Sequence, residues 1–199
     1  MAEGKALRQL SKSAPKKNDS SRRRRIVRAG AEESRRFQPS SEIAVTGSLR
    51  GWRVPRQALR ALLADYMAAL GMPKAGLTLQ MVDNAASQEL NRRFRGHDQP
   101  TDVLSFPTLT GRAPKGYGAY LGDLALDLPY AWAKRGRFDP DFSGEAAFLL
   151  LHGLLHLSGQ HHDSPAQDRL MWRLSRLHHP LWRRHKAALR ALRPQKKHS

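Results

Sequence analysis

The sequence predicts an α+β fold in which a mixed sheet of about four strands packs with helices in a single domain. Short segments with the alternating pattern of strands are interleaved with longer segments of helical character. The chain has 199 residues, which suits one domain with an attached tail. One of the helical segments is so apolar that it must be buried against other elements.

In the first half of this domain, Ser41–Ser48 is predicted to be a short strand. Pro55–Leu70 is an amphipathic helix that begins with proline and has Gly71 just beyond its end. Ala75–Asp83 alternates apolar and polar residues, as a strand does. Asn84–Arg95 begins with a favourable capping residue and is predicted to be a helix.

In the second half, Thr101–Pro107 is predicted to be a strand that proline closes, and Ala119–Leu128 another strand. Ser143–Gly159 is the mostly apolar, buried helix. Ala166–Arg193 is a basic helical segment that is interrupted near Pro180. The alternation of strands and helices is the pattern of an α/β or α+β domain.

Basic residues concentrate at the two ends of the chain. Residues 1–40 carry 12 Lys/Arg and four Asp/Glu, and residues 164–199 carry 10 and one, whereas residues 41–163 have a net charge of only +1. Basic ends of this kind favour a polyanionic partner, nucleic acid before an anionic membrane, over a tail that only improves solubility.

Residues 1–40 show no hydrophobic period and are predicted to form a disordered basic arm. Their Arg and Ser content would also suit a transit peptide, but four acidic residues argue against that alternative. Residues 41–199 are predicted to form the folded domain with its basic helical tail. The candidate RNA-binding residues of the arm are Arg22, Arg23, Arg24 and Arg25.

Composition excludes several classes of site. The chain has no cysteine, so any metal must be held by His, Asp or Glu rather than by thiolates. No apolar run approaches the roughly 20 residues that span a bilayer, and no apolar signal segment opens the chain. These features favour a cytoplasmic protein without a membrane partner.

A histidine motif in the apolar helix predicts a metal site. His152 and His156 are four residues apart, which places both rings on one helix face. Gly159 can end the helix and turn the chain back, so that a third ligand follows. Spacing favours His162 for that ligand, although His161 is adjacent. Three nitrogen ligands leave a fourth position open, as in catalytic zinc sites.

Gly153 stands where the metzincin proteases, with the pattern H-E-x-x-H-x-x-G-x-x-H, keep a glutamate. In those proteases the glutamate moves a proton from zinc-bound water to the leaving amine. An RNA phosphodiester depends less on this shuttle, because a metal can polarise the phosphoryl group while water or a 2′-hydroxyl attacks. The glycine therefore counts strongly against a peptidase and weakly against a nuclease.

Three stretches of the sequence form longer motifs. The first is "HGLLHLSGQHH" (His152–His162), the second is "ELNRRFRGHDQPTDVLSFP" (Glu89–Pro107), and the third, shorter one is "LGDLAL" (Leu121–Leu126). Together these motifs resemble the bacterial YbeY-type endoribonucleases. Order and spacing agree from about residue 41 to 180, and the two ends of the chain fall outside the resemblance.

The resemblance implies a zincin-like domain with single-strand-specific, metal-dependent endoribonuclease activity. It implies roles in 16S ribosomal RNA 3′-end maturation and ribosome quality control, with ribosomal RNA and the small ribosomal subunit as partners. It also implies one zinc ion per chain, held by His152, His156 and His162, and a functional arginine at Arg95.

Two positions depart from the family pattern. Gln160 stands where the family usually has tyrosine, and His161 where it usually has aspartate. The spacing of the three histidines is unchanged. The departure puts in doubt a role of the lost aspartate beside the metal, which Asp163 is a candidate to replace.

A role for Arg95 can also be argued without the family resemblance. A guanidinium at the end of a helix, before a glycine turn, can clamp a phosphate and stabilise the charge that develops on it. The alternative is that Arg95 only complements the helix dipole.

Several acidic and polar residues are weaker candidates. Asp102 and Ser105 are candidates to line the cleft, although Asp98 and Asp102 more simply order the turn before the strand. Asp123 follows a glycine, where a metal-facing carboxylate, a bulge and a surface ion pair are all open. Glu145 is a candidate base, but its place favours a role at the helix N-terminus.

The basic C-terminal segment combines arginines with tryptophans. Trp172 and Trp182 are expected to be core contacts rather than base-stacking platforms, with the arginines following a phosphate backbone. The candidate RNA-binding residues here are Arg173, Arg176, Arg183 and Arg184. Three further histidines, His178, His179 and His185, are expected at the surface.

Three hypotheses about function follow from the sequence. The first is a zinc endoribonuclease. The alternatives are a ribosome-associated RNA-binding factor with a structural zinc, and a zinc hydrolase of another substrate class, against which Gly153 argues. The cleavage position, the proton donor and the oligomeric state are open.

Overall fold

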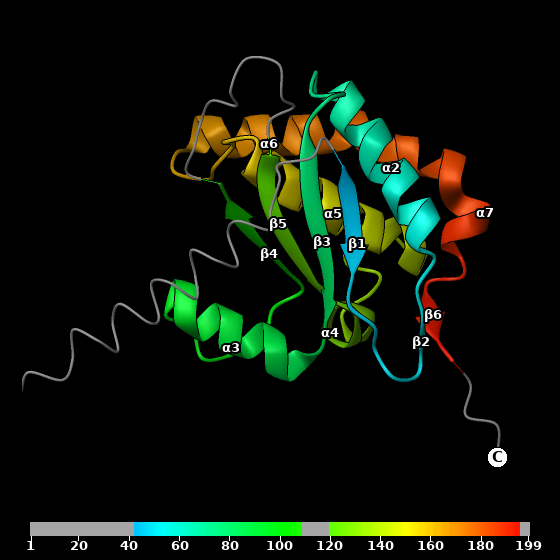
Figure 1. Cartoon of the computed structure of the whole chain (residues 1–199). Helices are drawn as coiled ribbons and strands as arrows, with labels where there is room; N and C mark the ends of the chain where they lie inside the picture. Colours follow the sequence, from blue (N-terminus) through cyan, green and yellow to red (C-terminus); the bar gives the residue numbers. More distant parts are fainter. Residues whose placement is uncertain (1–41, 109–119, 196–199) are drawn as a thin grey trace, which may run out of the picture. The chain divides into compact units, whose positions relative to one another are not determined.

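The computed structural model describes residues 42–108 and 120–195. Its main sheet has the strand order β1-β3-β5-β4 (Figure 1). The first three of these strands run parallel, and β4 pairs antiparallel with β5. The strands are β1 (Ile43–Thr46), β3 (Gly76–Val82), β4 (Val103–Pro107) and β5 (Tyr120–Asp127). This mixed four-stranded sheet confirms the predicted α+β class.

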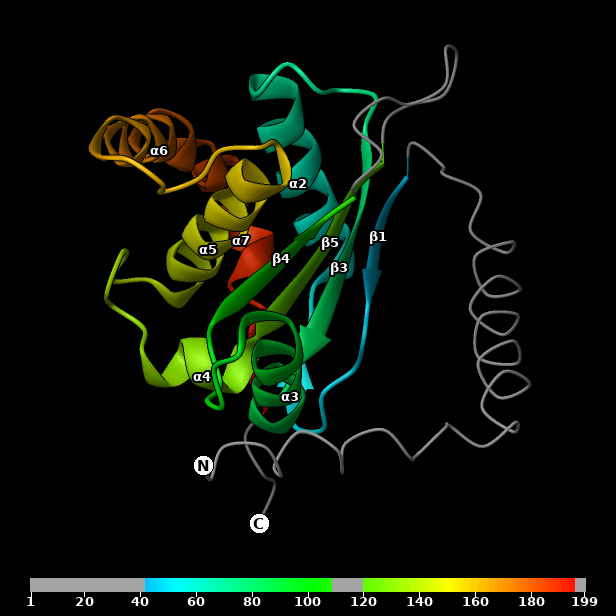
Figure 2. The same ribbon diagram turned by 90° about the vertical axis from the view of Figure 1, so that its left-hand side faces the viewer.

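Two helices pack directly on one face of the sheet. α2 (Arg56–Ala69) lies against β1, and α5 (Phe142–Leu157) lies against β4 and β5. Figure 2 shows α6 (Pro165–His178) in a further layer outside α5. Every residue of α5 is buried except His152 and His156. The apolar helix is thus the centre of the core, and its two histidines are the side chains that reach an opening.

The opposite face of the sheet is partly covered by α3 (Asn84–Arg95), which contacts β5. Asp83 caps this helix, since its carboxylate accepts the backbone N–H of Ala86 at 2.9 Å. Gly96, with φ of 73°, takes the left-handed conformation that ends it. These two signals fix Arg95 at the last turn of the helix.

The C-terminal segment breaks where the sequence predicts. α6 ends at His178, and a 3-10 helix, η1 (His179–His185), carries Pro180 in its first turn. A short α7 (Lys186–Leu189) follows. The proline removes a backbone donor and prevents the α-helix from continuing.

Three small elements were not predicted. β2 (Trp52–Arg53) pairs with β6 (Arg193–Pro194), two short strands that lie far apart in the sequence and carry no local period. α4 (Leu128–Ala133) begins where the predicted strand was expected to continue. It begins there because the Asp127 carboxylate accepts the backbone N–H of Tyr130 at 3.0 Å and caps the helix.

The predicted basic arm, residues 1–40, lies outside the described residues, as do Arg22 to Arg25. Within residues 42–108 and 120–195, no helix combines the length and the apolar character needed to cross a bilayer.

Candidate metal centre and active-site cavity

Three histidines converge at the C-terminal end of α5. The Nε2 atoms of His152 and His156, one helical turn apart, are 3.3 Å from each other. Gly159, with φ of 88°, reverses the chain after the helix. His162 then returns to the pair, and the three candidate ligand atoms lie within 4.8 Å of one another. His161 is exposed and lies outside this group.

Hydrogen bonds orient two of the three rings. The Nδ1–H of His156 donates to the Gln160 carbonyl at 2.9 Å. The Nδ1–H of His162 donates to the Asp168 carboxylate at 2.7 Å. A ring whose Nδ1 donates leaves Nε2 unprotonated in the neutral tautomer, which is the arrangement that metal-binding histidines adopt.

Burial keeps the histidine pair uncharged. It lowers the pKa of His152 to about 4, with the neighbouring His156, His162 and Arg137 adding to the effect. Burial also lowers the pKa of His156, although its bond to the Gln160 carbonyl opposes the shift. Both imidazoles are therefore neutral near pH 7, which is the form that binds a metal.

The donor set fits a metal ion that prefers nitrogen ligands. Zn–N bonds of about 2.0–2.1 Å in a tetrahedral site place two ligand nitrogens about 3.3–3.4 Å apart. The His152–His156 pair matches this spacing. The group of His152, His156 and His162 can therefore hold a metal ion in the part of the chain that the structure describes.

A cavity of about 410 Å³ opens beside His152 and His156. Arg95 lines it from the end of α3, and within residues 42–108 and 120–195 the hydrogen bond of its guanidinium is a long one, 3.5 Å from Nη2 to the Ser105 carbonyl. The guanidinium is near enough to help lower the pKa of His156. The structure therefore brings the predicted functional arginine and the histidine pair to one cavity.

The two candidate cleft residues of β4 and the turn before it line this cavity. Asp102 also orders the turn, since its carboxylate accepts the N–H of Val103 at 2.8 Å. Ser105 is buried and donates to the Gly153 carbonyl at 3.2 Å, so that it ties β4 to α5. Asp98 instead accepts a hydrogen bond from Gln88 at 3.0 Å.

Gly153 lies where α5 meets the sheet. A Cβ atom at this position would be 2.8 Å from the Leu124 Cδ2 atom and 3.3 Å from both the Ser105 Oγ and the Val103 Cγ2 atoms. A side chain at the position where metzincins keep their glutamate would therefore have to displace the ends of the Leu124, Ser105 and Val103 side chains. The glycine is explained by the close approach of helix and sheet.

Several residues that line the cavity or orient a ligand were not singled out from the sequence. Arg137 and Phe138 lie in the segment between α4 and α5 and line the cavity, as does Tyr130 of α4. Asp168, in the first turn of α6, is the partner of His162, a role for which only Asp163 was considered. No sequence motif marks the segment between α4 and α5. Asp168 could have been predicted, because it lies six residues after His162 at a position expected in the first turn of a helix, where acidic residues are favoured.

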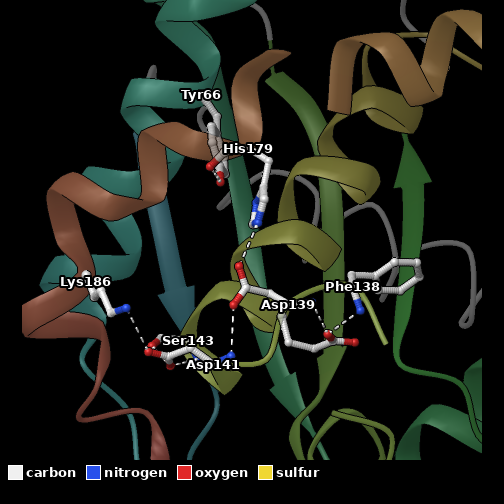
Figure 3. Close-up of polar contacts among 8 residues, drawn as sticks. Tyr66, Phe138, Asp139, Asp141, Ser143, His179 and Lys186 are labelled. Atoms are coloured by element: carbon white, nitrogen blue, oxygen red, sulfur yellow. Dashed lines mark hydrogen bonds and ion pairs between the residues drawn. The ribbon is translucent and has the colours of Figure 1, made fainter. Parts of the chain in front are cut away.

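Glu145 acts on this segment rather than on the cavity. Its side chain is buried, and Oε2 accepts the backbone N–H groups of Phe138 and Asp139 at 2.8 and 2.9 Å. Figure 3 shows Asp139 between His179, 3.3 Å away, and Asp141, whose N–H it accepts at 2.9 Å. A carboxylate committed in this way is not a free base. Glu145 instead fixes the backbone that presents Arg137 and Phe138.

All three histidines expected at the surface, His178, His179 and His185, are partly buried, and two of them contact a carboxylate. His179 contacts Asp139 and packs against Phe148 and Trp182, and burial lowers its pKa. His185 contacts Asp65 at 3.1 Å. The expectation failed because the 3-10 helix after His178 turns these side chains toward neighbouring elements.

Asp123 is exposed and accepts a hydrogen bond from the Tyr120 hydroxyl at 2.5 Å. The pairing of β3 with β5 shifts register beside it, and Gly122 has φ of 132°. Of the three alternatives for this residue, the structure supports the bulge.

The two tryptophans of the C-terminal segment differ. Trp182 is 2% exposed and belongs to the core, as expected. Trp172 is 42% exposed and lines the cavity, so the expectation of a core contact was wrong for it. The four candidate arginines of this region, Arg173, Arg176, Arg183 and Arg184, are exposed on α6 and η1.

Comparison with known proteins places this site in a family. The sequence profile described as endoribonuclease YbeY matches residues 52–179, which include Arg95 and all three histidines. The chain belongs to the YbeY family.

Individual YbeY proteins show the extent of the similarity. Endoribonuclease YbeY of Anaeromyxobacter dehalogenans is 44% identical over 122 residues, which are 61% of each chain. The Moorella thermoacetica endoribonuclease YbeY is 41% identical over 115 residues, which are 54% of this chain and 74% of the relative. The similarity thus spans less than two thirds of the first relative's length.

A solved structure shares the fold. The solution structure of TM1509 from Thermotoga maritima superposes with a TM-score of 0.51 at 23% identity, covering 73% of this chain and 92% of that one. At this identity the likeness describes the fold alone.

The structure also accounts for the two departures from the YbeY pattern. Gln160 contributes its backbone carbonyl to His156, which any residue type supplies. His161 is exposed, and its ring centroid is 6.0 Å from that of His156. Neither substitution changes the three rings that converge.

Asp168→Ala is expected to weaken zinc binding by about 10-fold. Residues that orient a metal-binding histidine contribute about 10- to 100-fold to affinity, and the exposure of this pair places it at the low end. Competition with a chromogenic chelator measures the effect. Asp163→Ala is the matched control with unchanged affinity. The opposite ranking of the two variants would show that Asp163 orients His162.

Proposed function

We propose that this protein is a zinc-dependent endoribonuclease that cleaves single-stranded RNA. One observation carries the proposal: His152 and His156, two of the three convergent histidines, share one cavity with the exposed Arg95. The names of its YbeY relatives support an RNA substrate. His152, His156 and His162 would hold one zinc ion per chain, with Arg95 as a catalytic residue.

A bound zinc ion supplies a Lewis acid for the scissile phosphate and its nucleophile. The residues of this chain supply the rest of the site. Arg95 and Arg137 enter the cavity from two different segments, and a guanidinium can contact a phosphate in two-pronged fashion. Both would hold the phosphate beside the histidines and neutralise the charge that develops on it.

The site favours a phosphodiester over an amide. Peptide hydrolysis by a metzincin-like site uses a glutamate beside the first histidine, and Gly153 stands at that position. Glu145 does not replace it, because its Oε2 already accepts the backbone N–H groups of Phe138 and Asp139. Metal-assisted cleavage of a phosphodiester depends less on such a carboxylate, because a metal can polarise the phosphoryl group.

The cellular role follows from the family. We propose that the substrate is ribosomal RNA on the small ribosomal subunit in the cytoplasm, and that cleavage contributes to 16S 3′-end maturation and ribosome quality control. The exposed arginines of α6 and η1, together with the basic arm, would contact the phosphate backbone. RNA affinity would then fall steeply as salt rises.

The test uses the full-length protein and a labelled single-stranded RNA with a 16S 3′-end precursor. Cleavage is expected to stop with a chelator and to return with zinc. Arg95→Ala is expected to lower the rate by about 100- to 1,000-fold, the size of effect seen when one charge-stabilising donor is removed. Arg93→Ala is the matched control, since Arg93 is exposed on the same helix but does not line the cavity.

Two results would contradict the proposal. If folded, zinc-loaded wild type does not cleave, the alternative of a ribosome-associated factor with a structural zinc gains weight. If Arg95→Ala cleaves as fast as wild type while circular dichroism shows an intact fold, Arg95 only complements the helix dipole.

A further inference from the structure

One side of the active-site cavity is a wall of aromatic rings. Phe138 and Phe148 are stacked, with ring centroids 4.2 Å apart and planes 18° apart. Trp172 completes the wall, with its centroid 6.0 Å from Phe148 and 6.3 Å from Phe138. The His152 ring lies nearly parallel to Phe148 at 6.4 Å. The wall therefore adjoins the candidate metal ligands.

The three rings differ in what covers them. Phe148 is 7% exposed and supports the other two. Phe138 has Phe148 on it and the Arg137 guanidinium 4.8 Å from its centroid. Trp172 is 42% exposed although it lines the cavity. Exposing a large indole ring to water is unfavourable for a residue that serves only the core. The same exposed ring can bind a ligand that has a flat apolar face.

Arginines outnumber carboxylates in the lining of the cavity. Arg95 and Arg137 line it together with Asp102, whose carboxylate is 3.7 Å from the Arg137 guanidinium. On α6, Arg176 follows Trp172 by one turn and Asp168 precedes it by one turn. The segment that carries Arg137 and Phe138 is fixed by Glu145 through two backbone hydrogen bonds. The aromatic wall therefore includes a segment whose backbone is held in place. A ligand that fits it combines a flat ring with adjacent negative charge.

We propose that Trp172 is the stacking platform for an unpaired nucleobase of the RNA, next to the phosphate held by Arg95 and Arg137. This inference rests on the proposed function and assigns a base-binding subsite to the same cavity. Aromatic side chains stack on bases of any sequence, because every base has a π face. A base in a duplex has both faces covered by its neighbours, so the subsite accepts single strands and rejects duplexes.

The test compares two probes of equal length and charge: a short fluorescent oligouridylate and an oligomer of the same sugar-phosphate backbone without bases. Binding to the full-length, metal-free protein is measured by anisotropy. Trp172→Ala is expected to bind the oligouridylate about 5- to 150-fold more weakly, the effect of losing one stacked base. It should bind the base-free oligomer as wild type does, because the phosphate contacts remain.

Two matched variants sharpen the result. Trp172→Phe keeps an aromatic face and should recover most of the affinity. Leu177→Ala removes a side chain that is 65% exposed on the same helix and does not line the cavity, so its affinity should equal that of wild type. The basic arm contributes equally to both probes, so the ratio of the two affinities isolates the base.

The subsite is overturned if Trp172→Ala binds the oligouridylate as tightly as wild type, or loses both probes equally with its fold intact. The second result would give Trp172 a structural or charge-orienting role. Either failure is separate from failure of the proposed function, which wild-type cleavage of RNA decides. If the wild-type protein bound the oligouridylate in a base-dependent way but did not cleave RNA, the base-binding subsite would be supported and the proposed enzymatic activity would be contradicted.

Discussion

His156→Ala is expected to abolish both tight zinc binding and RNA cleavage while the domain stays folded. His156 is half-buried at the mouth of the cavity, and its Nε2 is 3.3 Å from that of His152. Alanine leaves two nitrogen ligands where a catalytic zinc needs three. The loss should exceed the 10- to 100-fold effect typical of residues that only orient a ligand. Chelator competition and the cleavage assay measure the two losses.

His161→Ala is the matched control for this variant. It removes a histidine from the segment that follows α5, one that is exposed and outside the convergent group. Zinc affinity and cleavage should equal those of wild type. If His161→Ala lost zinc while His162→Ala retained it, the third ligand would be misassigned. Cleavage that persists in His156→Ala would point to a contaminating nuclease.

Gly153→Glu is expected to destabilise the domain strongly rather than to create a peptidase. A Cβ atom there already meets Leu124 at 2.8 Å, and the rest of the side chain would enter the packed contact between α5 and the sheet. Overpacking costs about 1–3 kcal/mol, and an unpaired buried carboxylate costs several more. A loss of at least about 4 kcal/mol from the free energy of unfolding follows. Urea unfolding measures it.

Gly153→Ala separates packing from charge. It adds only the Cβ atom and gains about 1 kcal/mol of helix propensity, so the net loss should be about 0–2 kcal/mol. Peptidase activity is expected from neither variant. A Gly153→Glu protein that unfolds within about 1 kcal/mol of wild type would show that the sheet can yield. The glycine would then need an explanation other than space.

The predictable parts of the site each depend on a short stretch of the sequence. His152 and His156 are linked by the helical period, and Gly159 and His162 by the turn that follows. A helix cap and a glycine mark the position of Arg95, but it was the resemblance to the YbeY family that singled it out as functional. In each case, neighbouring residues alone fix where the side chain goes.

The unpredicted part depends on contacts between distant segments. Arg137 and Phe138 reach the cavity because Glu145 and Asp139 hold a segment without regular structure. Trp172 and Trp182 both occur in the basic segment, yet only Trp182 is buried, since the 3-10 helix changes the direction of the chain between them. No local pattern distinguishes such residues.

The sequence by itself determined the α+β class, the histidine motif and the placement of Arg95, because helix period, alternation and capping act over a few residues. The tertiary structure alone decided that α5 presses Gly153 against β4 and β5, that Asp168 orients His162, and that an aromatic wall faces the cavity. These features arise from packing between elements, where shape and burial rather than local preference select the partners.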